Sequence, residues 1–288
     1  MSAAVVAYAG EPGAFAEEAA LRWFAAPDAR AVPSFRAVFE AVASSDVLAG
    51  VVPVESSRLG TIRESLDLLF ETGLPIVGEV SVPVRLALLG LPGERLETVT
   101  SVHSISAALA QADEFLRSRP WQVHTTWNTA GAAKEIAQRG ERGAAAVASA
   151  RVAKLYGLEV IVDGIQSGED NRTRFAVVAR DAASASTVRA AARPDLLELP
   201  AKTTLVFGVR NAPGSLYRSL GAFASRAINL SRLESRPWTG RGSRWEYLFW
   251  ADLDASTDDP ACRAALADLE SETEIVRILG SYPRAADD

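Results

Sequence analysis

The chain has few residues of the kinds that form disulfide bonds or zinc sites. Its 288 residues include one cysteine, Cys262, and two histidines, His103 and His124. A single cysteine excludes an intrachain disulfide and indicates a reducing compartment, so we expect a cytoplasmic protein. Because cysteine and histidine are the usual zinc ligands, we also expect no metal site.

Long apolar runs and an excess of basic residues are absent as well. No apolar stretch is long enough for a transmembrane helix, and the opening residues lack the basic start and apolar core of a signal peptide. A net charge of -6 argues against a nucleic-acid partner, because phosphate binding needs a basic face. What is present, 48% hydrophobic and 23% charged residues, is typical of a folded globular protein with room for two domains.

Short apolar runs alternate with helical patterns along the first 180 residues, which indicates a parallel or mixed sheet covered by helices. Strands are expected at 4–9, 32–33, 49–54, 98–102, 123–126, 144–147, 160–162 and 173–179, and helices at 15–24, 35–44, 61–70, 106–117, 130–139 and 150–156. The extended segment 74–84 is predicted to cross between two lobes, and the chain to return near 161–164. Two crossings leave a cleft between the lobes, where open α/β folds usually bind ligands.

The remainder of the chain has a different pattern. Residues 181–200 are rich in Ala, Ser, Arg and Asp without a clear period, and we interpret them as a linker. Residues 201–285 then follow the order strand, helix, strand, strand, helix, strand, which is the ferredoxin-like βαββαβ arrangement. The expected strands lie at 202–209, 229–236, 246–253 and 275–279, and the expected helices at 216–226 and 260–271.

Candidate catalytic residues stand at the start of the strand expected at 173–179. The Thr173 hydroxyl can donate a hydrogen bond, and the planar guanidinium of Arg174 can hold a carboxylate. The alternative is an ordinary solvated strand start, since hydroxyl and Arg residues are common there.

A second candidate is the loop at 53–60, between a buried strand and a helix. Its Ser56 or Ser57 and its backbone N–H groups could receive a carboxylate, with Glu55 nearby as an acid or an orienting group. The alternative is that one of the serines only caps the following helix.

Further polar residues stand at the starts of predicted helices beyond the first crossing. Ser104 and Gln111 are about two helical turns apart and would lie on nearly one face, directed at the cleft. Thr129 precedes the next helix and could bind an anion there. Each of the three could instead be an N-cap or a surface residue. His103 and His124 have no catalytic or metal-like spacing around them and are expected to be structural.

Taken together, these segments resemble the prephenate dehydratase family, including its plant arogenate dehydratase branch, over about residues 5–283. The matching segments are YAGEPGAF at 8–15, the loop at 50–60, TAGAA at 129–133, and NRTRF at 171–175, which contains the family's Thr-Arg-Phe signature. Two segments depart from the family. Ser56 replaces the Asn of its Glu-Asn-Ser loop, leaving Ser57 as the retained Ser, and SISA at 104–107 replaces its Ser-His-Pro-Gln.

The resemblance implies a two-lobed catalytic domain at 1–180, similar to periplasmic binding proteins, which converts prephenate to phenylpyruvate in phenylalanine biosynthesis. Prephenate loses carbon dioxide and its ring hydroxyl, and the gain of an aromatic ring drives the reaction without a metal or organic cofactor. By similarity, Thr173 donates to the leaving hydroxyl and Arg174 anchors a carboxylate, with Glu55 as the third catalytic residue. The substrate-binding residues that the resemblance implies are Ser57, Ser104, Gln111, Thr129, Asn171 and Phe175.

Residues 201–285 resemble an ACT domain, a small unit that binds amino acids. Its glycine-containing loop would let the backbone approach a ligand, and the following helix N-terminus suits a carboxylate. The resemblance implies phenylalanine as an allosteric effector and a homodimer or homotetramer, the alternative being a dimerisation module without a ligand. The effector residues that it implies are Asn211, Pro213, Gly214, Ser215 and Leu216 in the loop, and Glu234, Ser235, Arg236 and Pro237 in a second motif.

Three other functions stay open. A prephenate decarboxylase would keep the ring hydroxyl, an arogenate dehydratase would act on the amino form of the substrate, and a sensor would bind without turnover. The retained Thr173 favours dehydration, because a group directed at the leaving oxygen serves that step.

Overall fold

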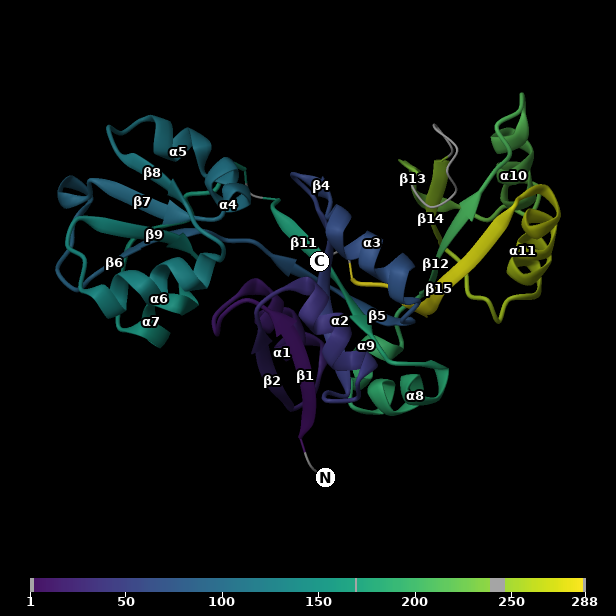
Figure 1. Ribbon diagram of the computed structural model, residues 1–288, viewed down its shortest axis with the longest axis horizontal. Coiled ribbons are helices and arrows are strands. Elements are labelled where there is room, and N and C mark those ends of the chain that lie inside the picture. Colours follow the sequence, from purple (N-terminus) through teal and green to yellow (C-terminus); the bar gives the residue numbers. More distant parts are fainter. Residues whose placement is uncertain (1–2, 169, 239–246, 287–288) are drawn as a thin grey trace.

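The computed structural model describes residues 3–168, 170–238 and 247–286. In that part of the chain three sheets form, each in its own body of the molecule (Figure 1). The first lobe lies in the centre, the second lobe on one side of it and the C-terminal domain on the other. The predicted two-lobed α/β fold with a C-terminal βαββαβ unit is therefore confirmed.

The first lobe is built on a sheet with the order β2-β1-β3-β11-β5, and β4 pairs with the end of β3. β1 runs parallel to β2 and β3, whereas β11 is antiparallel to both of its neighbours. β3 is buried on both faces, which explains its nearly continuous apolar sequence. The elements are β1 (Ala4–Ala9), α1 (Phe15–Trp23), β2 (Pro27–Val32), α2 (Phe35–Ala43), β3 (Ala49–Ser56), β4 (Gly60–Thr61), α3 (Arg63–Thr72), β5 (Ile76–Pro83) and β11 (Arg172–Val178).

The second lobe has the strand order β10-β6-β9-β7-β8. The chain enters it between β5 and β6 and leaves it between β10 and β11. Every residue of β9 is buried and small, which lets α6 pack closely on it through its own alanines. The elements are β6 (Ala87–Gly90), the 3-10 turn η1 (Leu96–Thr98), β7 (Ser101–Ser104), α4 (Ser106–Gln111), α5 (Asp113–Arg117), β8 (Gln122–Thr125), α6 (Thr129–Arg139), β9 (Ala144–Ala148), α7 (Arg151–Tyr156) and β10 (Glu159–Asp163).

The C-terminal domain has the strand order β13-β14-β12-β15, as a ferredoxin-like unit should. Helices α10 and α11 cover one face of this sheet. The opposite face packs against the first lobe. The elements are β12 (Ala201–Gly208), α10 (Ser215–Ala224), β13 (Leu230–Pro237), β14 (Tyr247–Leu253), α11 (Pro260–Glu272) and β15 (Ile275–Pro283).

The segment expected to be a linker is largely helical. It contains α8 (Ala182–Ala190) and α9 (Pro194–Leu197), and Val188 is buried in a core of the first lobe. Asp181 caps α8 by accepting a hydrogen bond from the backbone N–H of Ser184 at 2.7 Å. The sequence did not reveal α8 as a helix, because its residues are mainly alanine and serine. A single buried valine is too weak a signal of a helical apolar period.

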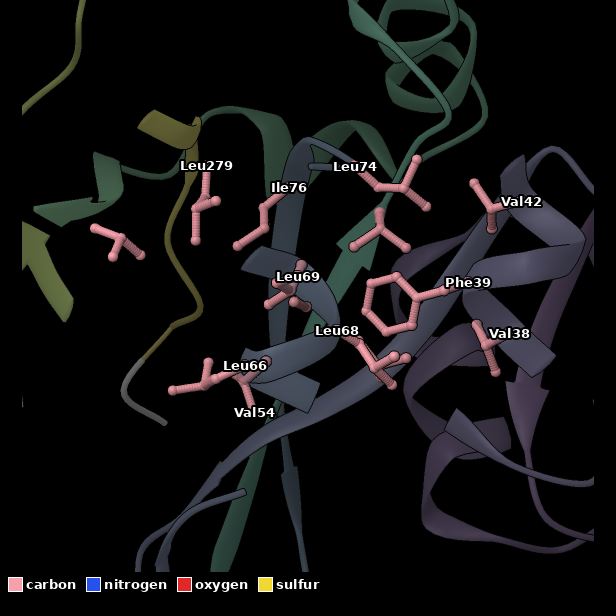
Figure 2. Packing of buried hydrophobic residues seen from close by; sticks show 14 of the residues in the cluster. Val38, Phe39, Val42, Val54, Leu66, Leu68, Leu69, Leu74, Ile76 and Leu279 are labelled. Carbon is pink, nitrogen blue, oxygen red and sulfur yellow. The ribbon is translucent and has the colours of Figure 1, made fainter. Parts of the chain in front are cut away.

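One apolar core is shared by the first lobe and the C-terminal domain. Leu66, Leu69 and Ile76 of the first lobe belong to the same buried cluster as Trp250 and Leu279. Figure 2 shows Leu279 beside Ile76 and Leu69 in this cluster. The two bodies are therefore joined by side-chain packing as well as by the chain.

The described residues contain no helix that is both long and apolar enough to cross a membrane. Within the same ranges no group of three or more His, Cys, Asp or Glu side chains is placed to hold a metal ion.

Candidate active site

A cavity of about 480 Å³ lies between the two lobes, at the carboxyl ends of the parallel strands. Open α/β sheets bind their ligands at this edge. Its polar lining residues come from both lobes, and they include Thr173, Gln111 and Thr129 from the sequence-based set, with Phe175 as an apolar wall. The structure therefore brings together four of the nine candidate residues of the catalytic domain.

A β-bulge shapes the first-lobe wall of this cavity. The register between β11 and β3 shifts between Arg174 and Phe175. In a regular strand, residues an odd number apart face opposite sides. The bulge lets Pro53 and Ser56, three residues apart on β3, both line the cavity. They stand there beside Thr173 and Phe175.

Several hydrogen-bond donors at the cavity are not used elsewhere in the described structure. The hydroxyl groups of Thr173 and Thr129 bond to no other described residue, although both side chains are largely buried. Gln111 accepts a hydrogen bond from Asn171 at 3.1 Å through Oε1, which leaves its amide Nε2 free to donate to a ligand. Such pre-placed donors are suited to hold a polar substrate.

Asn171 orients Gln111 and does not line the cavity itself. It is 3% exposed, and its Nδ2 donates to both Gln111 Oε1 and the carbonyl of Val84 at 3.2 Å. Its backbone carbonyl also accepts from Val84 N–H at 2.7 Å. Both crossings between the lobes are thus tied to one asparagine, next to the strand that carries Thr173.

Four helices of nine or more residues begin at the cavity wall. The first residues of α1, α2 and α6 line it, and α3 reaches it through its N-cap Ile62 and Glu64 in its first turn. A helix N-terminus carries partial positive charge and unpaired N–H groups, which favour anions. Among the described lining residues the only charged side chain is Glu64, in the first turn of α3. The site therefore offers backbone dipoles, rather than Lys or Arg, to a negative ligand.

Arg174 and Glu55 do not belong to this cavity. Arg174 follows Thr173 in an extended strand, so its side chain leaves by the opposite face of the sheet. There it pairs with Glu55 and comes within 3.6 Å of Asp252 in the C-terminal domain. Neither residue lines the cavity between the lobes, and the roles predicted for Arg174 as a carboxylate anchor and for Glu55 as a catalytic residue stay predictions.

Two serines of the predicted set also lie outside the cavity. Ser104 is fully buried, and its hydroxyl donates to the carbonyl of Val147 at 2.6 Å, which fixes β7 to β9. Ser57 donates to the carbonyl of Asp170 at 3.1 Å. Ser56, which replaces the family's asparagine, is the serine of this loop that lines the cavity. Which side of β3 the serines of this loop take depends on the bulge between β3 and β11, which the sequence alone does not give.

Other lining residues had no role in the sequence-based prediction. Asn128 caps α6 by accepting from Gly131 N–H at 2.8 Å. Opposite it, Gly10 has φ +123°, and a Cβ there would lie 2.4 Å from Asn128 Nδ2. Only glycine permits both that backbone and that approach. The approach of Gly10 to the second lobe depends on contacts between the lobes, and the sequence does not show it.

Polar contacts brace the lobes on the α6–α7 side of the cavity. Lys134 pairs with Glu11 at 2.9 Å and Arg151 with Glu17 at 2.8 Å. The Tyr156 hydroxyl donates to the carbonyl of Pro12 at 2.9 Å. These contacts join the loop before α1 and the start of α1 to α6 and α7.

Comparison with known proteins agrees with this geometry. A family model described as Prephenate dehydratase matches residues 6–183. The chain belongs to the prephenate dehydratase family. It is 40% identical to arogenate dehydratase/prephenate dehydratase 6 of Arabidopsis thaliana over 96% of its own length and 68% of that relative's. It is also 40% identical to arogenate dehydratase 1 of Petunia hybrida, over 96% and 66%.

Solved structures give the same result for the whole chain. Prephenate dehydratase from Arthrobacter aurescens in complex with L-Phe matches with a TM-score of 0.82 and 29% identity, covering 97% of this chain and 90% of that one. GqqA, described as a novel type of quorum quenching acylase, matches with a TM-score of 0.80 and 32% identity, covering 98% of both chains. The predicted family is confirmed, as is a hydro-lyase acting on prephenate in phenylalanine biosynthesis. The first relative is chloroplastic, so the expected cytoplasmic location stays a prediction.

The loop of the ACT-like domain in this prephenate dehydratase borders a second cavity of about 320 Å³. Asn211, Ser215 and Leu216 line it, together with Tyr247 and Phe249. Two other residues of the predicted loop set shape it without lining it. Gly214 has φ +80° and forms the turn into α10, directly after Pro213.

The second predicted motif lies elsewhere, against the first lobe. Arg236 pairs with Asp67 of α3 at 2.6 Å, and Glu234 accepts a hydrogen bond from the Thr61 hydroxyl. Ser235 and Pro237 are exposed on the opposite side of β13. None of the four residues lines the loop cavity in one chain.

Proposed function

We propose that the cavity between the lobes binds prephenate as its dianion and releases phenylpyruvate. The bond to the ring carboxylate breaks, its electron pair forms the new ring double bond, and the C–O bond to the ring hydroxyl breaks. One proton is taken up, and the products are carbon dioxide, water and the phenylpyruvate anion. The observation that carries this proposal is a set of unused donors beside converging helix N-termini.

The groups at the cavity have two roles: some bind the negative charges of the substrate, and others orient its ring and leaving group. Helix N-termini suit the two carboxylates, since the described lining has no cationic side chain. The free hydroxyl of Thr173 is the donor to the leaving oxygen, and Gln111 and Thr129 orient the ring. Hydroxide is a poor leaving group, so a hydrogen bond that strengthens as negative charge grows on this oxygen lowers the barrier.

Replacing the Thr173 hydroxyl tests this assignment. Thr173→Val keeps the shape and should lower kcat by about 100-fold or more with a small change in KM, because the donor acts mainly in the transition state. Thr173→Ser should restore most of the activity. Ser271→Ala, which removes an exposed hydroxyl from α11 in the C-terminal domain, is the control and should keep wild-type kcat. Phenylpyruvate absorbance gives the rates, and a valine variant with full kcat overturns the role of Thr173.

The same assay separates the alternatives. A product that keeps a non-aromatic ring indicates a decarboxylase. Calorimetric binding of prephenate without any product indicates a sensor.

A second candidate substrate is arogenate, in which an ammonium replaces the keto oxygen. Glu64, the one charged side chain among the described lining residues, could pair with that ammonium. Two relatives are also named arogenate dehydratases. Glu64→Gln should then lower kcat/KM for arogenate and leave prephenate nearly unchanged, and equal effects on both exclude Glu64 as the discriminating group.

The acylase activity of GqqA is not carried over to this chain. Acyl transfer needs a nucleophile activated by an adjacent base. No histidine, lysine or cysteine lines the described cavity.

Phenylalanine is the proposed effector, bound at the loop cavity of a homodimer or homotetramer. Backbone N–H groups at the start of α10 suit its carboxylate, and Leu216 and Phe249 give the cavity apolar walls. Asn211→Ala should weaken phenylalanine binding in calorimetry, whereas Asn229→Ala, in the same domain and outside the cavity, should not. Light scattering gives the number of chains, and a monomer excludes the proposed assembly.

The second motif gives a route from the effector domain to the cavity. Glu234 and Arg236 bind β4 and α3, and Thr61, the partner of Glu234, lines the cavity itself. A shift of β13 would therefore reach the wall of the substrate site directly.

A further inference from the structure

A cluster of charged side chains is buried where the ACT-like sheet meets the first lobe. Lys202 of β12 pairs with Glu79 of β5 at 2.7 Å, and both side chains are at most 5% exposed. Asp252 of β14 accepts a hydrogen bond from the Thr204 hydroxyl at 2.8 Å. Buried charges are costly unless paired, so the relative position of the two sheets is restricted at this point.

Arg174 is the residue that connects this cluster to the catalytic strand. Its guanidinium pairs with Glu55 of its own lobe and lies 3.9 Å from Glu79 and 3.6 Å from Asp252. Two of these acids belong to the first lobe and one belongs to the ACT-like domain. One side chain therefore spans the boundary between the domains.

The backbone of Arg174 lies directly beside the proposed proton donor. Thr173 precedes it in β11, and the β-bulge that shapes the cavity wall follows it. A strand is stiff along its length, so a displacement of the Arg174 side chain is passed to the neighbouring residues. The face that holds Arg174 and the face that holds Thr173 are two sides of one strand.

We propose that Arg174 is a positioning residue through which the ACT-like sheet, by way of Asp252, fixes Thr173 in the cavity. Arg174 touches no substrate in this arrangement, and it acts only through the placement of β11. The inference rests on the proposed role of Thr173 and adds a dependence of turnover on a residue of another domain.

The geometry makes a distinctive prediction for turnover. Arg174→Gln should lower kcat by about 10- to 100-fold, the size of effect that a displacement of about 1 Å at a catalytic group produces. The KM for prephenate should change less than about threefold, because no substrate contact is lost. Asp252→Asn should lower kcat in the same direction, although it lies in the ACT-like domain.

A double variant and a matched control complete the test. The double variant Arg174→Gln with Asp252→Asn should be no worse than the more affected single variant, since the contact between Arg174 and Asp252 is lost in each single variant. Arg172→Gln is the control, because Arg172 lies two residues earlier on β11 and its side chain, among the described residues, donates to Ser81 of its own sheet alone, at 2.9 Å. It should keep kcat within about twofold. Arg174→Lys keeps the charge and should recover part of the loss.

The outcomes distinguish this inference from the proposed function. If Arg174→Gln raises the KM for prephenate, and its effect adds to that of Asp252→Asn in the double variant, then Arg174 holds substrate. That result overturns the inference, and the dehydratase role stands. If wild-type protein makes no product, the proposed function fails. In that case hydrogen exchange tests the proposed coupling between Asp252 and β11 without an activity assay. Unchanged protection of the β11 amides in Asp252→Asn overturns the coupling.

Discussion

The first lobe has two neighbours, and it meets them in different ways. Its contact with the ACT-like domain is a shared apolar core with a buried ion cluster, in which Trp250 and Lys202 are almost fully enclosed. Its contact with the second lobe consists of two chain crossings, partly exposed polar contacts such as the pair of Lys134 with Glu11, and the partly buried ring of Phe15 packed against an apolar cluster of that lobe. The apolar clusters of the second lobe are built from its own buried residues, between 84 and 165.

The difference indicates where the molecule can move. Polar contacts with solvent nearby exchange for water at little cost, so the two lobes can open around the crossings. A continuous apolar core resists separation, because parting the surfaces exposes buried area. We therefore expect the first lobe and the ACT-like domain to behave as one body, with the substrate cavity at the boundary that opens.

The largest expected effect comes from emptying the shared core. Trp250→Ala should cost about 4 kcal/mol of unfolding free energy, because Trp250 is 1% exposed and packs edge-on against Phe70. Hydrogen exchange should accelerate in both the ACT-like sheet and β5. Ile136→Ala, in the second lobe, should cost about 3 kcal/mol and accelerate exchange only there. Acceleration confined to the ACT-like domain in Trp250→Ala would contradict the shared core.

A smaller loss is expected from crowding the same junction. A Cβ on Gly280 would lie 2.1 Å from the backbone carbonyl oxygen of Ile76, so Gly280→Ala should cost about 3 kcal/mol in thermal unfolding. Gly221 lies in α10 with open space around it, and Gly221→Ala should stabilise the helix by about 0.5–1 kcal/mol. Equal effects of the two variants would show that β15 does not press on β5.

The contact between the lobes should matter little for stability. Lys134→Ala should cost about 0.5 kcal/mol, because the pair with Glu11 is partly solvated. The same change should widen the distance between fluorophores placed on the two lobes, whereas Arg117→Ala, which breaks the ion pair with Asp113 within one lobe, should not. An unchanged distance in Lys134→Ala would mean that the crossings alone hold the lobes.

The smallest effect is a pH dependence local to the second lobe. Burial, and then the neighbouring His124, lower the pKa of His103, whose ring stacks on His124 at 4.8 Å. The unfolded chain therefore binds a proton more readily than the folded lobe just below the ordinary histidine pKa of about 6.5. The free energy of unfolding should fall as the pH drops below that value. Above it, the contribution of His103 should no longer change with pH. His103→Asn should flatten this part of the stability curve, and a dependence that persists must come from another group.

Most of the fold follows from apolar patterning. The strand expected at 144–147 and the helix at 130–139 match β9 and α6 closely, because buried runs and amphipathic periods are strong signals. β6 was missed because its short sequence continues the extended crossing before it. β2 begins five residues before the expected strand, since its charged residues belong to a half-exposed sheet edge.

The site was harder to predict, because it depends on which face each side chain takes. Adjacent residues of a strand point to opposite sides, so Thr173 and Arg174 could have been separated from the sequence alone. The bulge that brings Ser56 to the cavity depends on pairing between distant strands, and no local pattern reveals it. Gln111 was found by helical spacing, but the part of Asn171 in orienting it requires the crossings to be in place.

A substrate site that attracts anions through peptide groups has an unusual tolerance of alkali. Lysine and cysteine side chains change charge as the solution becomes basic, whereas amide dipoles at the ends of α1, α2, α3 and α6 keep their polarity. Affinity for a dicarboxylate should stay level from neutrality until the fold itself gives way. In this enzyme the attraction for the substrate is a property of the backbone and does not depend on the protonation of a lysine or cysteine side chain.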